Sequence, residues 1–167
     1  MDDAAQLTGL CPEAGAIAHR LGQRGESVAV AESAAGGLIS AALIAVPGAS
    51  AYYRGGLVIY TVDGARELLA GGPPLPTGVR GASEPFARWL ALAAAAKLSA
   101  DWAIGETGAA GPSGNPYGDP AGHAWVAVRG PGGEVRARHV LTGTVDRARN
   151  MEAFAAAALR LLLDALD

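Results

Sequence analysis

Short apolar runs separated by helical patterns constrain the fold of this chain more than any other feature of its sequence. Three runs have the length and composition of buried strands, with turn-forming or charged residues close by, and they cover residues 28–32, 56–60 and 102–106. Helical patterns precede, separate and follow these runs, at residues 12–24, 38–46, 63–70, 83–99 and 146–166. This alternation predicts an α/β fold with helices packed on a central sheet.

A hairpin near the carboxyl end makes the predicted sheet mixed. The segments HAWVAV and EVRARHV flank RGPGG, which is typical of a turn between two strands. Polar and apolar residues alternate in VRARH, which predicts one solvated face. With 167 residues, the chain is long enough to bury a substantial core. We therefore expect residues 1–167 to form a single domain, a three-layer α/β/α sandwich with a mixed, mostly parallel sheet.

Two predicted helices between the second and third strands begin at capping residues. Asp63 is the expected N-cap of the short helix 63–70, and Ser83 that of the longer helix, where Pro85 occupies the first turn. The segment GGPPLPTG between these helices has too many prolines and glycines to continue either one. An irregular connection is therefore expected there.

Charge and composition exclude several classes of function. Thirteen Lys and Arg residues stand against 16 Asp and Glu, without a basic run, so nothing favours a nucleic acid or an anionic membrane as partner. No apolar run approaches the roughly 20 residues of a membrane span. Cys11 is the single cysteine, no Cys/His cluster has the spacing of metal ligands, and no cofactor is expected. The acidic start, MDDAAQ, lacks the features of a signal peptide, which predicts a cytoplasmic protein.

Two of the predicted strands end in the same way. One runs through Glu32 and Ser33 into AAGG, and the other through Glu106 and Thr107 into GAAGPSG. Ligands of open α/β sheets bind beyond the carboxyl ends of strands, where glycines admit a ligand to backbone N–H groups and a helix N-terminus attracts an anion. A glycine-rich turn can also be a tight connection, and a serine here either caps the next helix or acts as a nucleophile. The repeated pattern favours a ligand site.

The segments AESAAGGLISAALIAVPGASAYYRGGLVIY, TGAAGPSG and PAGHAWVAV resemble the C-terminal domain of the competence-damage protein CinA. The family pattern reads roughly A-E-S-x-T-G-G, P-G-x-S-x-Y-x-x-G and T-G-x-A-G-P-x-G, and the resemblance covers nearly the whole chain. Stand-alone members of the family include deamidases of nicotinamide mononucleotide (NMN). The resemblance therefore implies hydrolysis of the NMN carboxamide to ammonia and nicotinate mononucleotide. It also implies a small-molecule nucleotide substrate and a homo-oligomer.

The same resemblance implies roles for individual residues. Ser33 matches the nucleophile that attacks the amide carbon, and Tyr60 matches the tyrosine that assists it. Arg147, near the start of the last helix, would pair with the substrate phosphate. The implied substrate-binding positions are Glu32, Gly36, Gly37, Ser50, Thr107, Gly108, Gly111 and Gly114.

The chain departs from the family pattern at a lysine. That lysine follows the tyrosine by five residues, whereas this chain has Ala65 there and its nearest cation is Arg66, about 100° away around a helix. A guanidinium does not lose its proton in proteins, so Arg66 could stabilise an oxyanion but could not activate Ser33. Ala35 replaces a usual threonine, and Asp119 replaces a frequent lysine.

Three functions therefore remain open. The leading one is an amidase of pyridine nucleotides whose activity is weakened, retuned or lost. The second is a non-catalytic member that binds a nucleotide or a partner, and the third is an amidase for another amide. Among the imidazoles, His123 is the candidate for the mouth of the site, whereas His19 and His139 are expected to be structural or solvated.

Overall fold

A five-stranded sheet forms the centre of the computed structural model, which describes residues 11–167. The strand order is β2-β1-β3-β4-β5, with the bounds β1 Val28–Glu32, β2 Tyr53–Val58, β3 Trp102–Ala109, β4 His123–Arg129 and β5 Val135–Leu141. β1 pairs in parallel with β2 and β3, and β4 is antiparallel to β3 and β5. Of the five strands in the described residues, four share one direction and β4 opposes them. The prediction of a mixed, mostly parallel sheet is confirmed.

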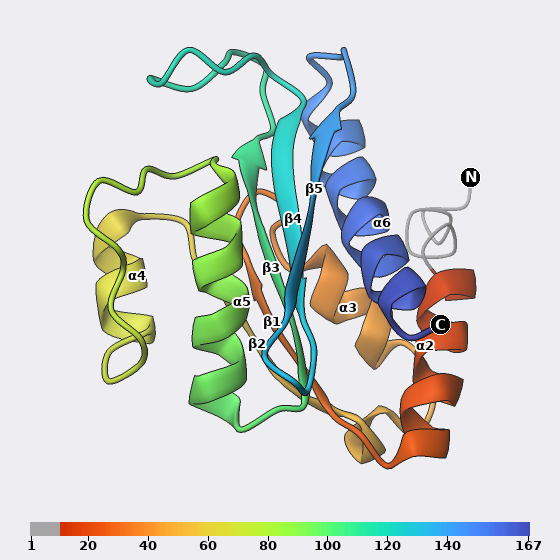
Figure 1. The fold of residues 1–167 in the computed structure, drawn as a ribbon. Helices are drawn as coiled ribbons and strands as arrows, with labels where there is room; N and C mark the ends of the chain where they lie inside the picture. Colours follow the sequence, from red (N-terminus) through yellow and green to blue (C-terminus); the bar gives the residue numbers. More distant parts are fainter. Residues whose placement is uncertain (1–10) are drawn as a thin grey trace.

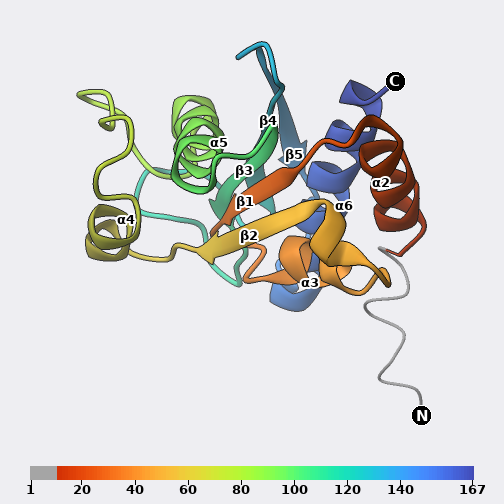
Figure 2. The ribbon, with the colours of Figure 1, turned by 90° about the horizontal axis from the view of Figure 1, so that it is seen from below.

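Helices cover both faces of this sheet (Figure 1). One face carries α2 (Cys11–Arg24), α3 (Leu38–Ile44) and α6 (Arg147–Ala165), and the other carries α4 (Val62–Leu68) and α5 (Glu84–Leu98). Figure 2 shows the same layers from below. Each face has its own apolar core, because helical stripes of Ile, Leu, Phe and Ala pack on alternate strand residues. The three-layer sandwich predicted from the sequence is confirmed.

Strand alternation decides which residues can reach each face. In β1, Val28 and Val30 join the core under α2, α3 and α6, whereas Ala29 and Ala31 join the core under α5. The same period of two sends Glu32 toward α3 and the next residue, Ser33, toward the α4–α5 side. β3 repeats this division at its own carboxyl end, with Glu106 and Thr107 pointing to opposite faces.

Three boundaries differ from those predicted. β2 ends at Val58, so Tyr60 lies beyond the strand. β3 continues through Thr107 and Gly108 to Ala109 because these residues pair with β4, so they are not part of a loop. The cap of α4 is Thr61, whose hydroxyl accepts the Gly64 N–H at 3.0 Å. The prediction of an Asp63 cap is therefore wrong, since Asp63 already lies inside the helix.

The acidic start on which the expectation of no signal peptide rests lies outside the described residues. Within residues 11–167, no helix combines the length and apolar character that crossing a membrane requires. The same part of the chain contains no group of three His, Cys, Asp or Glu side chains that could hold a metal ion.

Candidate functional site

A cavity of about 590 Å³ lies beside the carboxyl ends of β1 and β3, between α4, α5 and the irregular segment 71–82. The side chains of Ser33, Tyr60 and Thr107 line it, together with Gly108. Much of the remaining wall is apolar or aromatic and includes Leu69, Pro73, Leu75, Val79, Phe86 and Trp89. This is the edge of the sheet at which α/β folds bind ligands.

The turn after β1 places Ser33 on the cavity wall. Its backbone N–H donates to Glu106 Oε2 at 2.9 Å, and the N–H of Ala35 donates to the same oxygen at 2.9 Å. The Ser33 carbonyl accepts the Gly36 N–H at 3.0 Å. The main chain around Ser33 is therefore bound to neighbouring groups, while its side chain faces the cavity.

Gly36 and Gly37 give this turn its shape. Their φ angles of +66° and +100° lie in the left-handed region, which favours glycine. A Cβ on Gly36 would also approach Met151 Cε at 2.7 Å. Neither glycine lines the cavity beside Ser33. They shape the backbone turn that carries Ser33.

Glu32 does not face the cavity, which corrects its predicted role in substrate binding. The side chain is fully buried, and its carboxylate accepts the N–H groups of Gly37, Ile39 and Ser40 at 3.0–3.1 Å. It also accepts the Ser40 hydroxyl at 2.6 Å. Glu32 thus satisfies the free N–H groups at the start of α3, which otherwise lacks a side-chain cap.

Ser50 lies at the opposite end of the sheet, and its predicted role is corrected as well. It belongs to the short turn η1 (Ala49–Ala51) before β2. The backbone carbonyl of Tyr52, next to this turn, accepts the N–H of Val28 at 2.7 Å. Val28 begins β1, whereas Ser33 follows its last residue. The two serines are therefore separated by the length of a strand.

Tyr60, on the cavity wall, contacts Arg147, which is not itself among the lining residues. Arg147 Nη2 donates to the Tyr60 phenol oxygen at 2.6 Å, and Nη1 donates to the carbonyl of Gly111. Tyr60 is 67% exposed. Because its oxygen accepts from the guanidinium, the phenol proton remains free for another acceptor. Three predicted site residues, distant in sequence, are thus brought into one polar cluster.

Gly111 and Gly114 lie where another stretch of backbone comes close to their own. A Cβ on Gly111, whose φ is +106°, would lie 2.9 Å from the carbonyl oxygen of Val145, and one on Gly114 would clash with that of Asp119. Neither lines the cavity with Ser33. They shape the loop that Arg147 holds.

Thr107 links β3 to the segment over the cavity. Its side chain is 3% exposed, and its hydroxyl accepts the N–H of Ala82 at 3.1 Å. Ala82 has a φ of +50°, which is unusual for a residue with a Cβ. The Thr107 hydroxyl therefore fixes the end of segment 71–82 where this segment meets α5.

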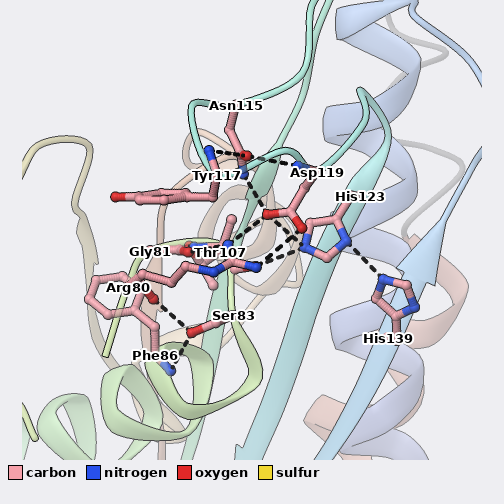
Figure 3. A network of polar contacts seen from close by, with 11 residues as sticks. Arg80, Gly81, Ser83, Phe86, Thr107, Asn115, Tyr117, Asp119, His123 and His139 are labelled. Atoms are coloured by element: carbon pink, nitrogen blue, oxygen red, sulfur yellow. Dashed lines mark hydrogen bonds and ion pairs between the residues drawn. The ribbon is translucent and has the colours of Figure 1, made fainter. Parts of the chain in front are cut away.

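A polar network outside the predicted site runs along the same edge (Figure 3). Arg80 donates to both carboxylate oxygens of Asp119, at 2.6 and 3.2 Å, and its guanidinium lies 4.9 Å from the centre of the Tyr117 ring. The Arg80 hydrogen bonds, followed by the Asn115 hydrogen bond, lower the pKa of Asp119. Arg80, Asn115 and Tyr117 line the cavity. Arg80 therefore lies on the cavity wall together with Arg66, and no local sequence pattern connects Arg80 to Asp119.

His123 is buried against this network and does not line the cavity. Its Nε2 lies 2.7 Å from the carbonyl of Ala82, so this nitrogen carries the proton. Its Nδ1 then accepts from Nε2 of the exposed His139 at 2.9 Å. The predicted place of His123 at the mouth of the site is corrected, since the imidazole is hydrogen-bonded to the Ala82 carbonyl instead.

Position 65 faces the cavity but holds no base. The Ala65 side chain is 7% exposed and forms part of the wall. Arg66, the next residue, also borders the cavity, but its side chain is mostly exposed and pairs with Asp63 at 3.3 Å. A lysine at position 65 would thus project into the site, whereas Arg66 is directed partly to solvent.

Glu106 belongs to the repeated strand-end pattern, but the sequence assigned it no role in the site. The side chain is fully buried, and Oε1 has no hydrogen-bond partner within residues 11–167. Burial raises its pKa from 4.5 to about 7, against the lowering effect of the Ala35 and Ser33 N–H bonds and with a smaller contribution from Glu32. An acidic residue beside the expected nucleophile is therefore poised between its two protonation states near neutral pH.

The family model described as the CinA C-terminal domain matches residues 12–166. The chain belongs to this CinA family. The CinA-like protein of Anaeromyxobacter sp. (strain K) is 42% identical over 141 residues, which make up 84% of this chain and 34% of that protein. The CinA-like protein of Prochlorococcus marinus (strain MIT 9313) is 41% identical over 120 residues, 72% of this chain and 28% of the relative. The chain thus spans about a third of the length of such curated CinA-like relatives.

Solved CinA structures share the fold. Competence/damage inducible protein CihA of Agrobacterium tumefaciens has a TM-score of 0.85 and 32% identity, with 94% of both chains covered. The CinA superfamily protein of Enterobacter cloacae has a TM-score of 0.87 and 28% identity, covering 95% of this chain and 92% of the other. Both likenesses therefore cover nearly the whole chain.

Proposed function

We propose that this CinA-family domain is an amidohydrolase that removes ammonia from the carboxamide of NMN, with Ser33 as its nucleophile. The observation that carries the proposal is the common cavity of Ser33, Tyr60 and Thr107 at the carboxyl ends of β1 and β3. The aromatic rings of Phe86 and Trp89 suit a flat pyridine ring. Arg147, which contacts Tyr60 on the cavity wall, suits the phosphate.

The reaction requires Ser33 to lose a proton as it attacks. Ser33 Oγ forms a bond to the amide carbon, and the C–N bond then breaks as the nitrogen gains a proton and leaves as ammonia. Water hydrolyses the resulting ester and regenerates the serine. Tyr60 can relay this proton, because its free phenol proton can pass to the leaving nitrogen while its oxygen takes up the serine proton.

A non-catalytic nucleotide-binding role is the second candidate. The observation that favours it is Ala65, which occupies the cavity wall where the family pattern has a lysine. A domain of this kind would keep the cavity and Arg147 but lack the base.

Ammonia release from NMN tests the proposed hydrolysis, with Ser33→Ala as the decisive variant. We expect Ser33→Ala to abolish the ammonia released by the wild type, because the attacking oxygen is gone. Ser50→Ala is the matched control, since Ser50 is exposed at the other end of the sheet, and its rate should equal that of the wild type. Turnover that survives Ser33→Ala would exclude the serine mechanism. NMN binding without turnover would favour the non-catalytic role.

Calorimetric titration with NMN tests the phosphate site. Arg147→Ala is expected to weaken NMN binding by about 10- to 100-fold, because one charge-assisted pair contributes about 1.5–3 kcal/mol. Arg149→Ala, on the same helix turn but paired with Asp146, should leave the affinity unchanged. Nicotinamide riboside, which lacks the phosphate, should bind the wild type and Arg147→Ala equally. An unchanged NMN affinity in Arg147→Ala would remove this residue from the phosphate site.

A further inference from the structure

The two carboxyl oxygens of Glu106 have different surroundings. Oε2 accepts two backbone N–H groups, those of Ser33 and Ala35, each at 2.9 Å. Oε1 is buried and has no partner in the described part of the chain. A proton on Oε1 would therefore leave both bonds of Oε2 intact. Glu106 belongs to β3, and its carboxyl thus binds two N–H groups of the turn that follows β1, with one residue between them.

The amide between these two has no such bond. Among residues 11–167, no hydrogen bond is formed by the N–H of Ala34, the residue between them, which is 5% exposed as a whole. Because the N–H groups on both sides of it are bonded to Glu106, the Ala34 N–H is the amide of this turn that remains available to an acceptor from outside the chain. In hydrolases with a serine on a strand-to-helix turn, the N–H of the residue after the serine stabilises the oxyanion.

We infer that Glu106 is the positioning residue of this turn, an inference that rests on the proposed function of Ser33. It binds the amides on either side of Ala34, which keeps the Ser33 hydroxyl on the cavity wall and reserves the Ala34 N–H for the oxyanion. Glu106 does not touch the substrate, because strand alternation directs it to the α3 face of the sheet. Its contribution passes through the backbone of residues 33–35.

Few charges act on Glu106 from the elements packed around it. Glu32 on β1 is the carboxylate that acts on it. α3 contains no titratable residue, β4 places Val126 beside it, and α6 contributes the uncharged Asn150 and Phe154 to this buried face. His123 of β4 lies further along the same ladder, opposite Ala109, so the comparison with Glu106→Gln assigns a response of the turn to pH near 7.

Two variants with side chains close to glutamate in size test the role of Glu106 as a hydrogen-bond acceptor. They separate the loss of the acceptor from the loss of charge or volume. Glu106→Gln keeps an oxygen for the two amides, whereas Glu106→Met fills the same space without an acceptor. The probe is phenylmethanesulfonyl fluoride, which requires no natural substrate: Ser33 Oγ bonds to sulfur, and fluoride leaves with the serine proton. Mass spectrometry measures the rate of labelling at Ser33, and NMN turnover gives kcat and KM separately.

We expect Glu106→Met to slow both labelling and kcat by about 10- to 100-fold with KM nearly unchanged, on the scale of losing an oxyanion contact. Glu106→Gln should stay within about threefold of the wild type. Equal labelling rates in the two variants would overturn the inference while leaving Ser33 as nucleophile. Absence of Ser33 labelling in the wild type would instead count against the proposed function.

A measurement on the wild type decides the question even if Glu106→Met does not fold. In an NMR titration, the amide protons of Ser33 and Ala35 should shift together with a midpoint at about 7, and the shift should vanish in Glu106→Gln. Amide protons of Ser33 and Ala35 whose shifts are the same in the wild type and Glu106→Gln at every pH would show that Glu106 does not control the turn.

Discussion

Replacing Ala65 by lysine is expected to raise the rate of NMN deamidation by about 10²–10⁴, the usual contribution of a general base. Position 65 is buried on the cavity wall, so the new amine would be partly desolvated. Desolvation lowers the pKa of a lysine and leaves more of it neutral near pH 7. A neutral amine can accept the Ser33 proton as the oxygen attacks. The measurement is ammonia release at saturating NMN.

Three controls make this gain specific. Ala65→Met introduces a similar volume without an amine and should give no increase. Arg66→Lys should help less than Ala65→Lys, because its side chain leaves the helix about 100° away. The gain should disappear when Ser33→Ala is added. If Ala65→Lys binds NMN but does not accelerate turnover, a lysine at position 65 does not act on Ser33. Brisk wild-type turnover that depends on Ser33 would show that another group already serves as the base.

The second large effect concerns stability, and it comes from Glu106. Its pKa is raised from 4.5 to about 7 by burial. Below pH 4.5 the folded and unfolded states are both protonated, whereas between pH 4.5 and 7 only the unfolded state has lost its proton. Rising pH therefore lowers the free energy of unfolding through this window, and above it the loss is constant at about 3 kcal/mol.

Chemical denaturation at pH 4.5, 6 and 8 tests this expectation by comparing the wild type with Glu106→Gln. The difference in unfolding free energy between them should change by about 3 kcal/mol in favour of Glu106→Gln as pH rises. The change of this difference with pH is compared, and not its value at one pH, because the buried glutamine amide lowers the free energy of unfolding by an amount that does not depend on pH. Glu67→Gln removes an exposed carboxylate from α4 and controls for net charge. Parallel pH profiles for wild type and Glu106→Gln would contradict the raised pKa of Glu106.

The layers of the fold are predictable from the sequence because they follow from local periodicity. Each apolar run is long enough for a strand, and each helical pattern has one apolar face. The carboxyl end of β3 is not predictable in this way, since Thr107 and Gly108 are paired by β4, a partner far along the chain. Similarly, local spacing cannot show that Ser50 lies at the amino end of the sheet, away from Ser33.

The candidate site could be predicted only in part, for a similar reason. Ser33, Tyr60 and Thr107 follow from motif positions, and the structure brings them to one cavity. Glu32 and Glu106 stand in similar local sequences, yet one caps α3 and the other binds the turn of a neighbouring strand. The pairing of Arg80 with Asp119 also joins segments that no sequence pattern connects.

The bonding of the turn after β1 determines its electrostatic polarity. The N–H groups of Ser33 and Ala35 point to Glu106, and those of Gly37, Ile39 and Ser40 point to Glu32. Their positive ends are thus directed into the protein under α3, and two acidic side chains compensate them. Despite its glycines, this turn is not a phosphate cradle of the kind found where such N–H groups face a ligand. A substrate would meet it with an uncharged group, such as a carboxamide, and carry its negative charge toward Arg147.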